Sequence, residues 1–290
     1  MEIVTDSGVD LSLTPAQIAD LHIHVVPLVV SLEGQSYRER VDIQADAFYD
    51  KLAHSENMPT TSQPSAGDFA TLYRRLAAQK AEILSIHMSS GLSGTFASAL
   101  AGAGLVPEAK VTHVDTKNLS AASGWQVEAG ARMARAGWGM ERILPFLRKI
   151  GEASDSLFTL AELKYLIHGG RISHMKGLIA SLLNIKPLIG VEKVRGTYVQ
   201  RGNARAFPAA LAGLVGVIAG QHPPGSNLRV QVMHANNPGG AGDLRALLDT
   251  RFRCDWRPTA QMSLVLGAHT GPTMVGVAFA PARVFAEVPS

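Results

Sequence analysis

Short apolar runs alternate with longer stretches of helical periodicity along the first half of the chain. The apolar runs predict strands over residues 2–5, 24–30, 82–88 and 110–114. Helices are predicted over residues 45–54, 66–79, 95–104, 119–136 and 140–153, and another begins at Pro15 behind a Thr14 cap. Strands that alternate with helices favour a mostly parallel sheet with helices on both faces.

The second half of the chain has a different pattern, in which hairpins are mixed with helices. Strands are predicted over residues 156–160, 185–192, 197–201, 228–234, 262–269 and 274–280, with a hairpin around Arg195-Gly196. Helices are predicted over residues 161–168, 175–183, 207–219 and 240–251. We therefore expect an α/β protein of two domains. Residues 1–153 form a mostly parallel sheet with flanking helices, and residues 154–290 form a mixed α/β domain with antiparallel strands.

Composition and charge narrow the class of protein. Apolar residues make up 46% of the 290 residues and charged residues 18%, which favours a large core over disorder. The net charge is +3 and the basic residues are scattered, so nucleic acid is not an expected partner. Cys254 is the single cysteine, which excludes an intramolecular disulfide and fits a cytoplasmic protein. The first residues do not have the pattern of a signal peptide.

A loop of small hydroxyl residues joins the predicted strand 82–88 to the predicted helix 95–104. It reads His87-Met88-Ser89-Ser90-Gly91-Leu92-Ser93-Gly94-Thr95-Phe96. Glycines permit close backbone approach, and the free N–H groups at a helix start favour an anion. We predict that this loop, and Ser93 in particular, holds a negatively charged group. Turn formation and helix capping are the alternative roles of its serines.

A second group of hydroxyl residues precedes the predicted helix 66–79. Thr61 and Ser62 lie in this segment, and Ser65 with Asp68 has the spacing of a capping box. The segment is therefore a second candidate for anion binding.

Further polar candidates lie in the second half. The predicted strand 262–269 delivers His269 and Thr270 into a Gly-Pro turn, where a histidine either faces an anion or has a structural role. Arg171 follows two glycines, and it either satisfies carbonyl groups at a helix end or contacts a phosphate or a partner. Arg205, near the end of the hairpin, is a candidate for the same contact.

Two enzymatic alternatives are weaker. The segment Gly91-Leu92-Ser93-Gly94-Thr95 lacks the last glycine of the Gly-x-Ser-x-Gly motif, and no base accompanies Ser93. Asp6 and Asp115 each end a predicted strand, and together they form a candidate Mg²⁺ site of a stand-alone phosphotransferase or hydrolase. Turn capping is the alternative role of both acids. We expect no catalytic residue and no bound metal ion.

An apolar patch lies between the predicted helix 175–183 and the hairpin. Its members are Leu178, Ile179, Leu182, Leu183, Ile185, Leu188 and Ile189. Such a patch is typical of a core, and it can also wall a lipid tunnel.

Taken together, these motifs resemble the DegV family, and the match runs in order over nearly the whole chain. The matching segments are Thr5-Asp6-Ser7-Gly8, Val26-Pro27-Leu28, Thr61-Ser62-Gln63-Pro64-Ser65, Ser89-Ser90-Gly91-Leu92-Ser93-Gly94-Thr95, Asp115-Thr116, Leu163 to Ser173 with Gly169-Gly170-Arg171, Lys186-Pro187-Leu188 and His269-Thr270-Gly271-Pro272.

The resemblance implies a two-domain α/β protein with a fatty acid in a tunnel between the domains. Members are similar to the subunit of bacterial fatty acid kinase that presents an acyl carboxylate to a separate ATP-using kinase subunit, which makes acyl phosphate for phospholipid synthesis. The carboxylate would be bound by Thr61, Ser93 and His269-Thr270, with Ser62 as a further candidate. Arg171 and Arg205 would face the phosphoryl group or the kinase.

Two departures from the family pattern are visible. Thr273 replaces a second glycine after Gly271-Pro272, and the basic run after the late hairpin is thin. Our leading hypothesis is a cytoplasmic lipid carrier that needs a partner kinase, uses no cofactor and contacts membranes transiently. The alternatives are the Mg²⁺-dependent enzyme and a regulatory module that senses lipid through Arg171.

Overall fold

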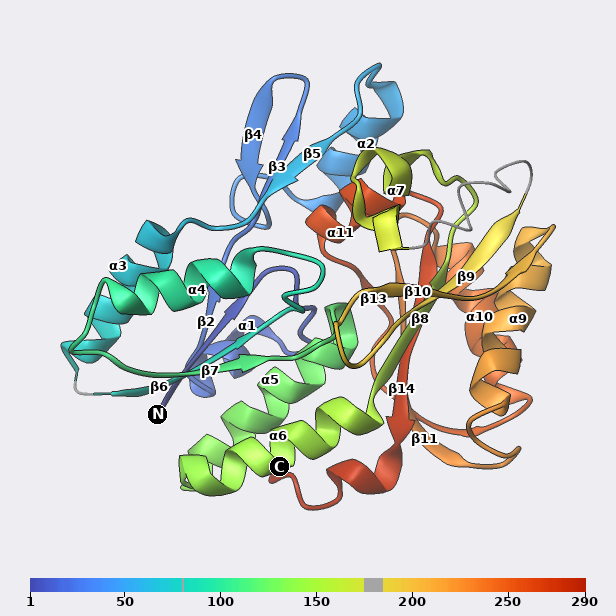
Figure 1. The fold of residues 1–290 in the computed structure, drawn as a ribbon. Helices are drawn as coiled ribbons and strands as arrows, with labels where there is room; N and C mark the ends of the chain where they lie inside the picture. Colours follow the sequence, from blue (N-terminus) through green and yellow to red (C-terminus); the bar gives the residue numbers. More distant parts are fainter. Residues whose placement is uncertain (80, 175–184) are drawn as a thin grey trace.

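The buried apolar strands of the N-terminal half form a parallel sheet (Figure 1). The computed structural model describes residues 1–79, 81–174 and 185–290. The order in the sheet is β2-β1-β6-β7. These strands are β1 (Glu2–Asp6), β2 (Ile23–Val26), β6 (Glu82–His87) and β7 (Lys110–Asp115). All three pairings are parallel, so the carboxyl ends of the strands share one edge, as the alternating pattern predicted.

Both faces of this sheet are covered because neighbouring strand residues point to opposite sides. Val4 and Ile83 pack against α3 (Ala66–Ala77) and α4 (Thr95–Gly104). Ile3 and Leu84 belong to the core cluster on the other face, where α5 (Ser120–Arg135) lies, followed along the chain by α6 (Met140–Ala153). The helix α1 (Pro15–Asp20) starts at Thr14 in a capping box. Helices on both faces of a parallel sheet are therefore confirmed.

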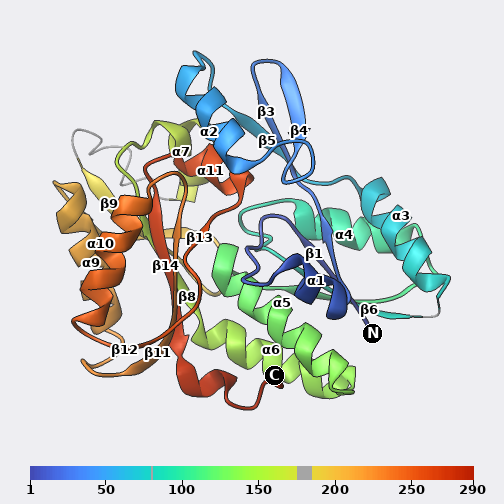
Figure 2. The same cartoon turned by 180° about the vertical axis from the view of Figure 1, so that it is seen from behind.

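The C-terminal half forms a mixed sheet in the order β10-β9-β8-β14-β11-β12, with β13 beside β11 (Figure 2). Its strands are β8 (Asp155–Thr159), β9 (Lys186–Val191), β10 (Tyr198–Ala204), β11 (Asn227–His234), β12 (Arg253–Trp256), β13 (Ala260–Gln261) and β14 (Val275–Pro281). The predicted hairpin is present as β9 and β10. The helices α9 (Phe207–Ala219) and α10 (Pro238–Asp249) pack on one face, and η2 (Ala282–Phe285) follows β14.

Helix α5 joins the two halves. It contacts β1 and β6 of the parallel sheet and β8 and β14 of the mixed sheet. Trp125 is buried in this helix and donates from Nε1 to Gln231 Oε1 of β11 over 3.2 Å. A helix buried on nearly all sides shows little amphipathic pattern, and α5 is of this kind.

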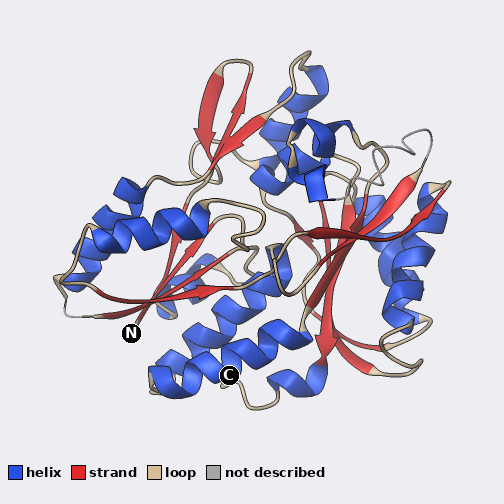
Figure 3. Ribbon diagram, in the orientation of Figure 1, coloured by secondary structure: helices blue, strands red, loops and turns tan. Residues whose placement is uncertain are grey.

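The predicted strand 24–30 is wrong as a single element. Pro27 divides it into β2 and β3 (Val29–Leu32), which belong to different sheets. A proline has no N–H to donate to a ladder, so the chain leaves the parallel sheet there. β3 pairs with β4 (Gln35–Arg38) and β5 (Thr60–Ser62) in a small antiparallel sheet, seen at the top of Figure 3. The helix α2 (Ala45–His54) lies between β4 and β5 in the chain.

The predicted strand 262–269 is also wrong, because this segment forms the helix α11 (Leu264–Thr270). All seven of its residues are buried. A short apolar run that is buried on every side carries no period that would distinguish strand from helix.

Three further predictions concern the connection between the two halves of the chain. The helix predicted over 161–168 is shorter, as α7 (Lys164–His168), and is followed by η1 (Arg171–His174). The helix predicted over 175–183 lies outside the described residues. The strands of the large sheets lie on either side of the predicted domain boundary at 153/154, which remains our assignment. No helix in the described ranges is long and apolar enough to cross a bilayer.

The packing of α3 against α4 gives a test of the N-terminal half. A Cβ on Gly102 would lie 2.6 Å from Phe69 Cβ and 2.9 Å from Ala66 O, whereas a Cβ on Gly104 would meet nothing within 4 Å. We expect Gly102→Ala to lower the free energy of unfolding by about 1–3 kcal/mol through overpacking. Gly104→Ala, in the same helix, should raise it by about 0.4–1 kcal/mol. Urea unfolding measures both, and equal effects would contradict the close helix packing.

Candidate functional site

A narrow pocket lies where the small antiparallel sheet, the loop before α4 and the C-terminal half meet. It takes Thr61 from β5, Ser93 from the loop before α4, Arg171 from η1 and His269 from α11. The lining residues are Leu28, Thr61, Ser62, Gln63, Met88, Leu92, Ser93, Arg171, Tyr198, Val265, Leu266 and His269. Five of the residues predicted from the sequence are therefore brought together, and apolar side chains fill the wall between them.

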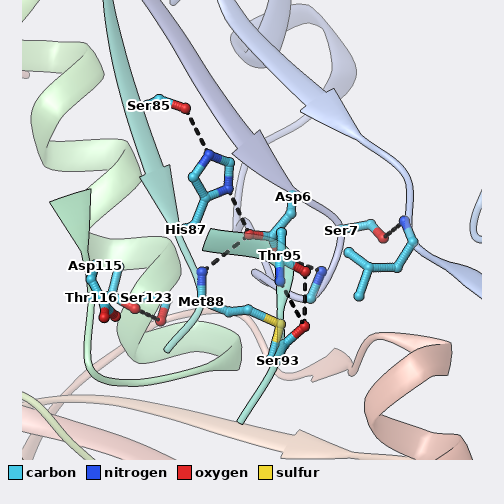
Figure 4. Close-up of polar contacts among 12 residues, drawn as sticks. Asp6, Ser7, Ser85, His87, Met88, Ser93, Thr95, Asp115, Thr116 and Ser123 are labelled. Atoms are coloured by element: carbon cyan, nitrogen blue, oxygen red, sulfur yellow. Dashed lines mark hydrogen bonds and ion pairs between the residues drawn. The ribbon is translucent and has the colours of Figure 1, made fainter. Parts of the chain in front are cut away.

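The loop before α4 is anchored by a buried carboxylate (Figure 4). Asp6 Oδ1 accepts from the Gly8 amide over 3.0 Å, and Asp6 Oδ2 accepts from the Met88 amide over 3.1 Å. His87 Nδ1 lies 2.9 Å from the same Oδ2, and both side chains are fully buried. This contact fixes the ends of β1 and β6 relative to each other at the point where the loop begins.

Behind this contact, Ser85 Oγ lies 2.6 Å from His87 Nε2 and 2.7 Å from the Tyr73 hydroxyl. The order serine, histidine, aspartate has the form of a catalytic triad. None of the three side chains reaches solvent, since each has 0% of its surface exposed. The cluster therefore supports the loop from inside the core.

The loop itself packs against the turn of the β9–β10 hairpin. Ser89 Oγ donates to Gly196 O over 2.8 Å, and a Cβ on Gly91 would lie 2.2 Å from Arg195 O, which requires glycine there. Ser93 Oγ accepts from the Thr95 amide over 3.2 Å and lies 2.8 Å from Thr95 Oγ1. The turn-forming role considered for the serines is thus present in Ser93, which also lines the pocket, while Gly94 is the residue that caps α4.

Thr61 and His269 form the central polar contact of the pocket. Thr61 Oγ1 lies 2.8 Å from His269 Nε2, and the histidine is 8% exposed. Burial, followed by the positive charges of Arg171 and His168, lowers the pKa of His269 to about 4. The imidazole is therefore neutral at neutral pH, and it offers either a donor or a lone pair at Nε2, depending on the tautomer.

Arg171 carries the positive charge of the pocket. Its Nη1 donates to Gly169 O over 2.6 Å and its Nε donates to Leu92 O over 3.4 Å. The first contact is the helix-end role considered from the sequence, because Gly169 follows the last residue of α7. The second ties the arginine to the loop that carries Ser93, so one guanidinium connects both halves of the protein.

Three predicted residues have less direct positions. Ser62 lines the pocket but is exposed. Thr270 is buried, and its hydroxyl donates along α11 to Leu266 O over 3.0 Å. Arg205 is exposed beyond the end of β10 and is not among the lining residues.

Asp6 and Asp115 do not share a site. Asp115 accepts from Ser90 and from Lys117, whose Nζ lies 2.8 Å from Oδ2, while Asp6 is held by His87 and backbone amides. Their separation is visible in Figure 4. Among residues 1–79, 81–174 and 185–290, no group of three or more His, Cys, Asp or Glu side chains is arranged to hold a metal ion. The two acids thus have the turn-capping roles that the sequence left open.

Some lining residues were not predicted. Gln63 packs against Gly94, because a Cβ there would lie 2.7 Å from its Nε2. Tyr198 begins β10, and burial raises the pKa of its hydroxyl. Gln63 stands next to the predicted Thr61 and Ser62, so extending that segment by one residue would have found it. Nothing in the sequence around Tyr198 marks it as part of a site.

The pocket is narrow, with free room for about one water molecule. A second, mainly apolar pocket lies nearby between the start of α5 and the mixed sheet, and Phe158, Met233, Met262 and Met274 contribute to it. The rings of Phe158 and Tyr198 meet edge to face with centroids 5.3 Å apart. Since Tyr198 lines the first pocket and Phe158 the second, this aromatic pair connects the walls of the two pockets.

The fold and the pocket together define a class of protein. It is an α/β protein with one parallel and one mixed sheet. Its pocket combines hydroxyl, imidazole and guanidinium groups with apolar walls. The chain belongs to the DegV family. The family model, described as an uncharacterised protein of the DegV family, matches residues 1–282.

Individual relatives agree with this assignment. A DegV domain-containing protein of Staphylococcus aureus (strain MRSA252) is 35% identical over 278 residues, which cover 95% of this chain and 96% of that one. The fold is similar to the solved structure of a DegV family protein from Thermus thermophilus, with a TM-score of 0.85, 29% identity and coverage of 97% and 99%. It is also similar to DegV from Bacillus subtilis, with a TM-score of 0.85, 27% identity and coverage of 96% and 98%.

The low pKa of His269 predicts a pH dependence of stability. Because the folded pKa of about 4 lies below the ordinary 6.5, the unfolded chain binds the proton more readily between these values. The stabilisation by the neutral imidazole is complete above pH 6.5 and is lost as the pH falls towards 4. We therefore expect the free energy of unfolding to fall by about 2 kcal/mol between pH 7 and pH 5. Urea unfolding of His269→Gln should lack this part of the pH dependence, whereas His54→Gln, at an exposed position of α2, should keep it. Protonation of the His269 ring near pH 6.5 in an NMR titration would contradict the assignment.

Proposed function

We propose that this protein binds one long-chain fatty acid, with the carboxylate held by Thr61, Ser93 and His269 and the tail enclosed by apolar side chains. The observation that carries the proposal is the contact between Thr61 and a neutral, buried His269 in a pocket that Ser93 and Arg171 also line. Ser62 and Thr270 stay weaker candidates for the same carboxylate.

The comparisons support this ligand. The Thermus thermophilus relative is described by its fatty acid binding, and the Bacillus subtilis relative is described as a fatty acid binding protein. Both cover nearly the whole of this chain, so the pocket belongs to the part of the fold that they share.

The chemistry of the pocket suits a carboxylate that must be bound and still react. A buried carboxylate needs hydrogen bonds, because leaving it bare costs several kcal/mol. Two hydroxyl groups and an imidazole supply donors without a full ion pair on both oxygens. Arg171 adds a positive charge nearby while its own Nη1 and Nε remain on carbonyl groups. The carboxylate would therefore stay nucleophilic.

The tail supplies the affinity. Burying ~15 methylene groups at about 0.8 kcal/mol each offers roughly 12 kcal/mol before the costs of binding. In the described residues the pocket is too narrow for such a chain, so binding requires its apolar walls to move apart. The Phe158–Tyr198 pair and the methionines of the neighbouring apolar pocket are suited to this, since methionine adapts its shape readily.

The pocket further supports a carrier role. We infer that the protein presents the carboxylate to a separate ATP-using kinase subunit, which forms the acyl phosphate for phospholipid synthesis, and that it has no catalytic activity by itself. Arg171, and the exposed Arg205, would meet the phosphoryl group or the kinase. The carrier would work in the cytoplasm and contact a membrane surface only transiently to exchange its ligand.

The proposal predicts a bound lipid. Protein purified without detergent should release one long-chain fatty acid per chain when it is denatured, because the tail contributes most of the binding free energy. Mass spectrometry of the denatured protein measures the ratio. Protein that contains no fatty acid, and that takes up none when oleate is added, would refute the proposal.

The role of the Thr61 hydroxyl can be isolated with an isosteric change. Thr61→Val should weaken oleate binding about tenfold, because a hydrogen bond to a charged group is lost while the shape is kept. It should slow acyl phosphate formation by an added ATP-dependent kinase to a similar extent. Thr60→Val changes the neighbouring exposed residue of the same strand and should leave both quantities unchanged. Equal behaviour of the two variants would exclude Thr61 from the site.

A further inference from the structure

A buried carboxylate outside the pocket holds the helix that carries His269. Glu39 follows β4 and is 1% exposed. Its Oε2 accepts from Ser7 Oγ over 2.7 Å and from Ser263 Oγ over 2.9 Å. Its Oε1 accepts from the Leu264 amide over 2.5 Å. Ser263 and Leu264 are the cap and the first residue of α11, and His269 lies in the last turn of the same helix.

The start of α11 depends on acids from the N-terminal half. The first amides of a helix have no partner within the helix, and a negative charge near them is favourable. Ser263 caps α11 with its backbone, while its hydroxyl is used by Glu39. The Ser263 backbone also lies beside Asp10, whose Oδ1 is 2.7 Å from Arg40 Nη2. Residues more than 200 positions earlier in the chain therefore determine where α11 begins.

We propose that Glu39 is a positioning residue for the pocket: as an ionised carboxylate it holds the first turn of α11 and thereby sets His269 against Thr61 for the ligand. This inference rests on the proposed function, since the ligand carboxylate is what His269 is positioned for. Glu39 does not line the pocket, and it acts through the helix.

The charge of Glu39 changes near neutral pH. The groups that face it are Asp10, Arg40 and Tyr49 of α2, with the hydroxyls of Ser7 and Ser263. Two acids thus share one arginine, whose Nε lies 3.9 Å from Glu39 Oε1. Burial, partly offset by Arg40, raises the pKa of Glu39 to about 7. A protonated Glu39 cannot accept from all three donors with the same strength.

Helix α11 has little freedom to compensate elsewhere. A Cβ on Gly267 would lie 2.1 Å from the Tyr49 hydroxyl, so α2 and α11 are in close contact in the middle of the helix. Helix α11 has only seven residues, so a rotation about this contact moves its first and last turns at the same time. The last turn carries His269. Release of the first turn therefore displaces the imidazole from Thr61.

The sign of the pH effect separates positioning from plain stability. The folded pKa of Glu39 lies above its ordinary 4.5, so the folded state binds the proton more readily and this group stabilises the fold as the pH falls from 8 to 6. Ligand binding should change in the opposite direction and weaken over the same interval. A purely structural role would move both quantities together.

The experiment compares Glu39→Gln with Glu33→Gln, which removes an exposed acid between β3 and β4. Oleate affinity is measured at pH 8 and pH 6. For the unchanged protein and for E33Q we expect oleate to bind about tenfold more weakly at pH 6 than at pH 8. This factor corresponds to the loss of one hydrogen bond to a charged group. For E39Q we expect weak binding at both values, because the amide has one acceptor for three donors. The ionisation of oleate itself is common to all three proteins, so the difference between their profiles reports on Glu39.

Two further measurements make the outcome decisive. The imidazole signals of His269 in ligand-free protein should show a small step near pH 7, without the large nitrogen shift of ring protonation, and this step should be absent in E39Q. Glu39→Asp keeps the charge and should keep this step, which covers the case in which E39Q does not fold. E39Q with the affinity and the pH profile of the unchanged protein would overturn the inference, and so would a folded E39D without the step. If the unchanged protein binds no oleate at all, the proposed function fails, and the ligand-free NMR step still tests Glu39 separately.

Discussion

The buried carboxylate of Asp6 is the contact on which the pocket depends. It accepts from the Met88 amide and meets His87 at the end of β6, so it connects the ends of two adjacent parallel strands. A carboxylate removed from water must be fully hydrogen-bonded, and backbone amides are the partners available at strand ends. The loop that bears Ser93 therefore leaves the sheet at a fixed place, with no charge of its own exposed to a ligand.

The same requirement explains the rest of the polar interior. Glu39 satisfies the start of α11, Arg171 satisfies the carbonyl groups of Gly169 and Leu92, and Gln231 satisfies Trp125 of α5. Apart from the local bond of Arg171 to Gly169, each of these contacts joins segments far apart in the chain. As a result, the two halves meet along a seam of specific hydrogen bonds as well as apolar contacts. The pocket lies on this seam, where desolvation lowers the pKa of His269 and keeps its imidazole neutral.

Local sequence patterns predict the wrong element at two places in this chain and miss Tyr198 of the pocket. The run from Met262 to His269 has no polar face, since α11 is enclosed by α2, α7 and the small sheet, so its pattern predicts a strand instead of a helix. The strand over 24–30 was extended through Pro27 because its apolar run is continuous, although the proline moves the chain from one sheet to another. Tyr198 lies in the pocket because β10 pairs with β9, and no local sequence pattern predicts that position.

Local sequence patterns are enough to predict the alternation of strands and helices in the N-terminal half, the hairpin of the C-terminal half, and the small hydroxyl loops around Thr61 and Ser93. These follow from side-chain periodicity, glycine and capping residues, all of which act within a few positions of the chain. Three contacts become visible only in the folded chain: Thr61 meets His269 across 208 positions, Arg171 lines the same pocket, and Glu39 binds the first turn of α11. Such contacts form because buried polar groups must find partners wherever the folded chain brings them, and sequence distance carries no information about which partner that is.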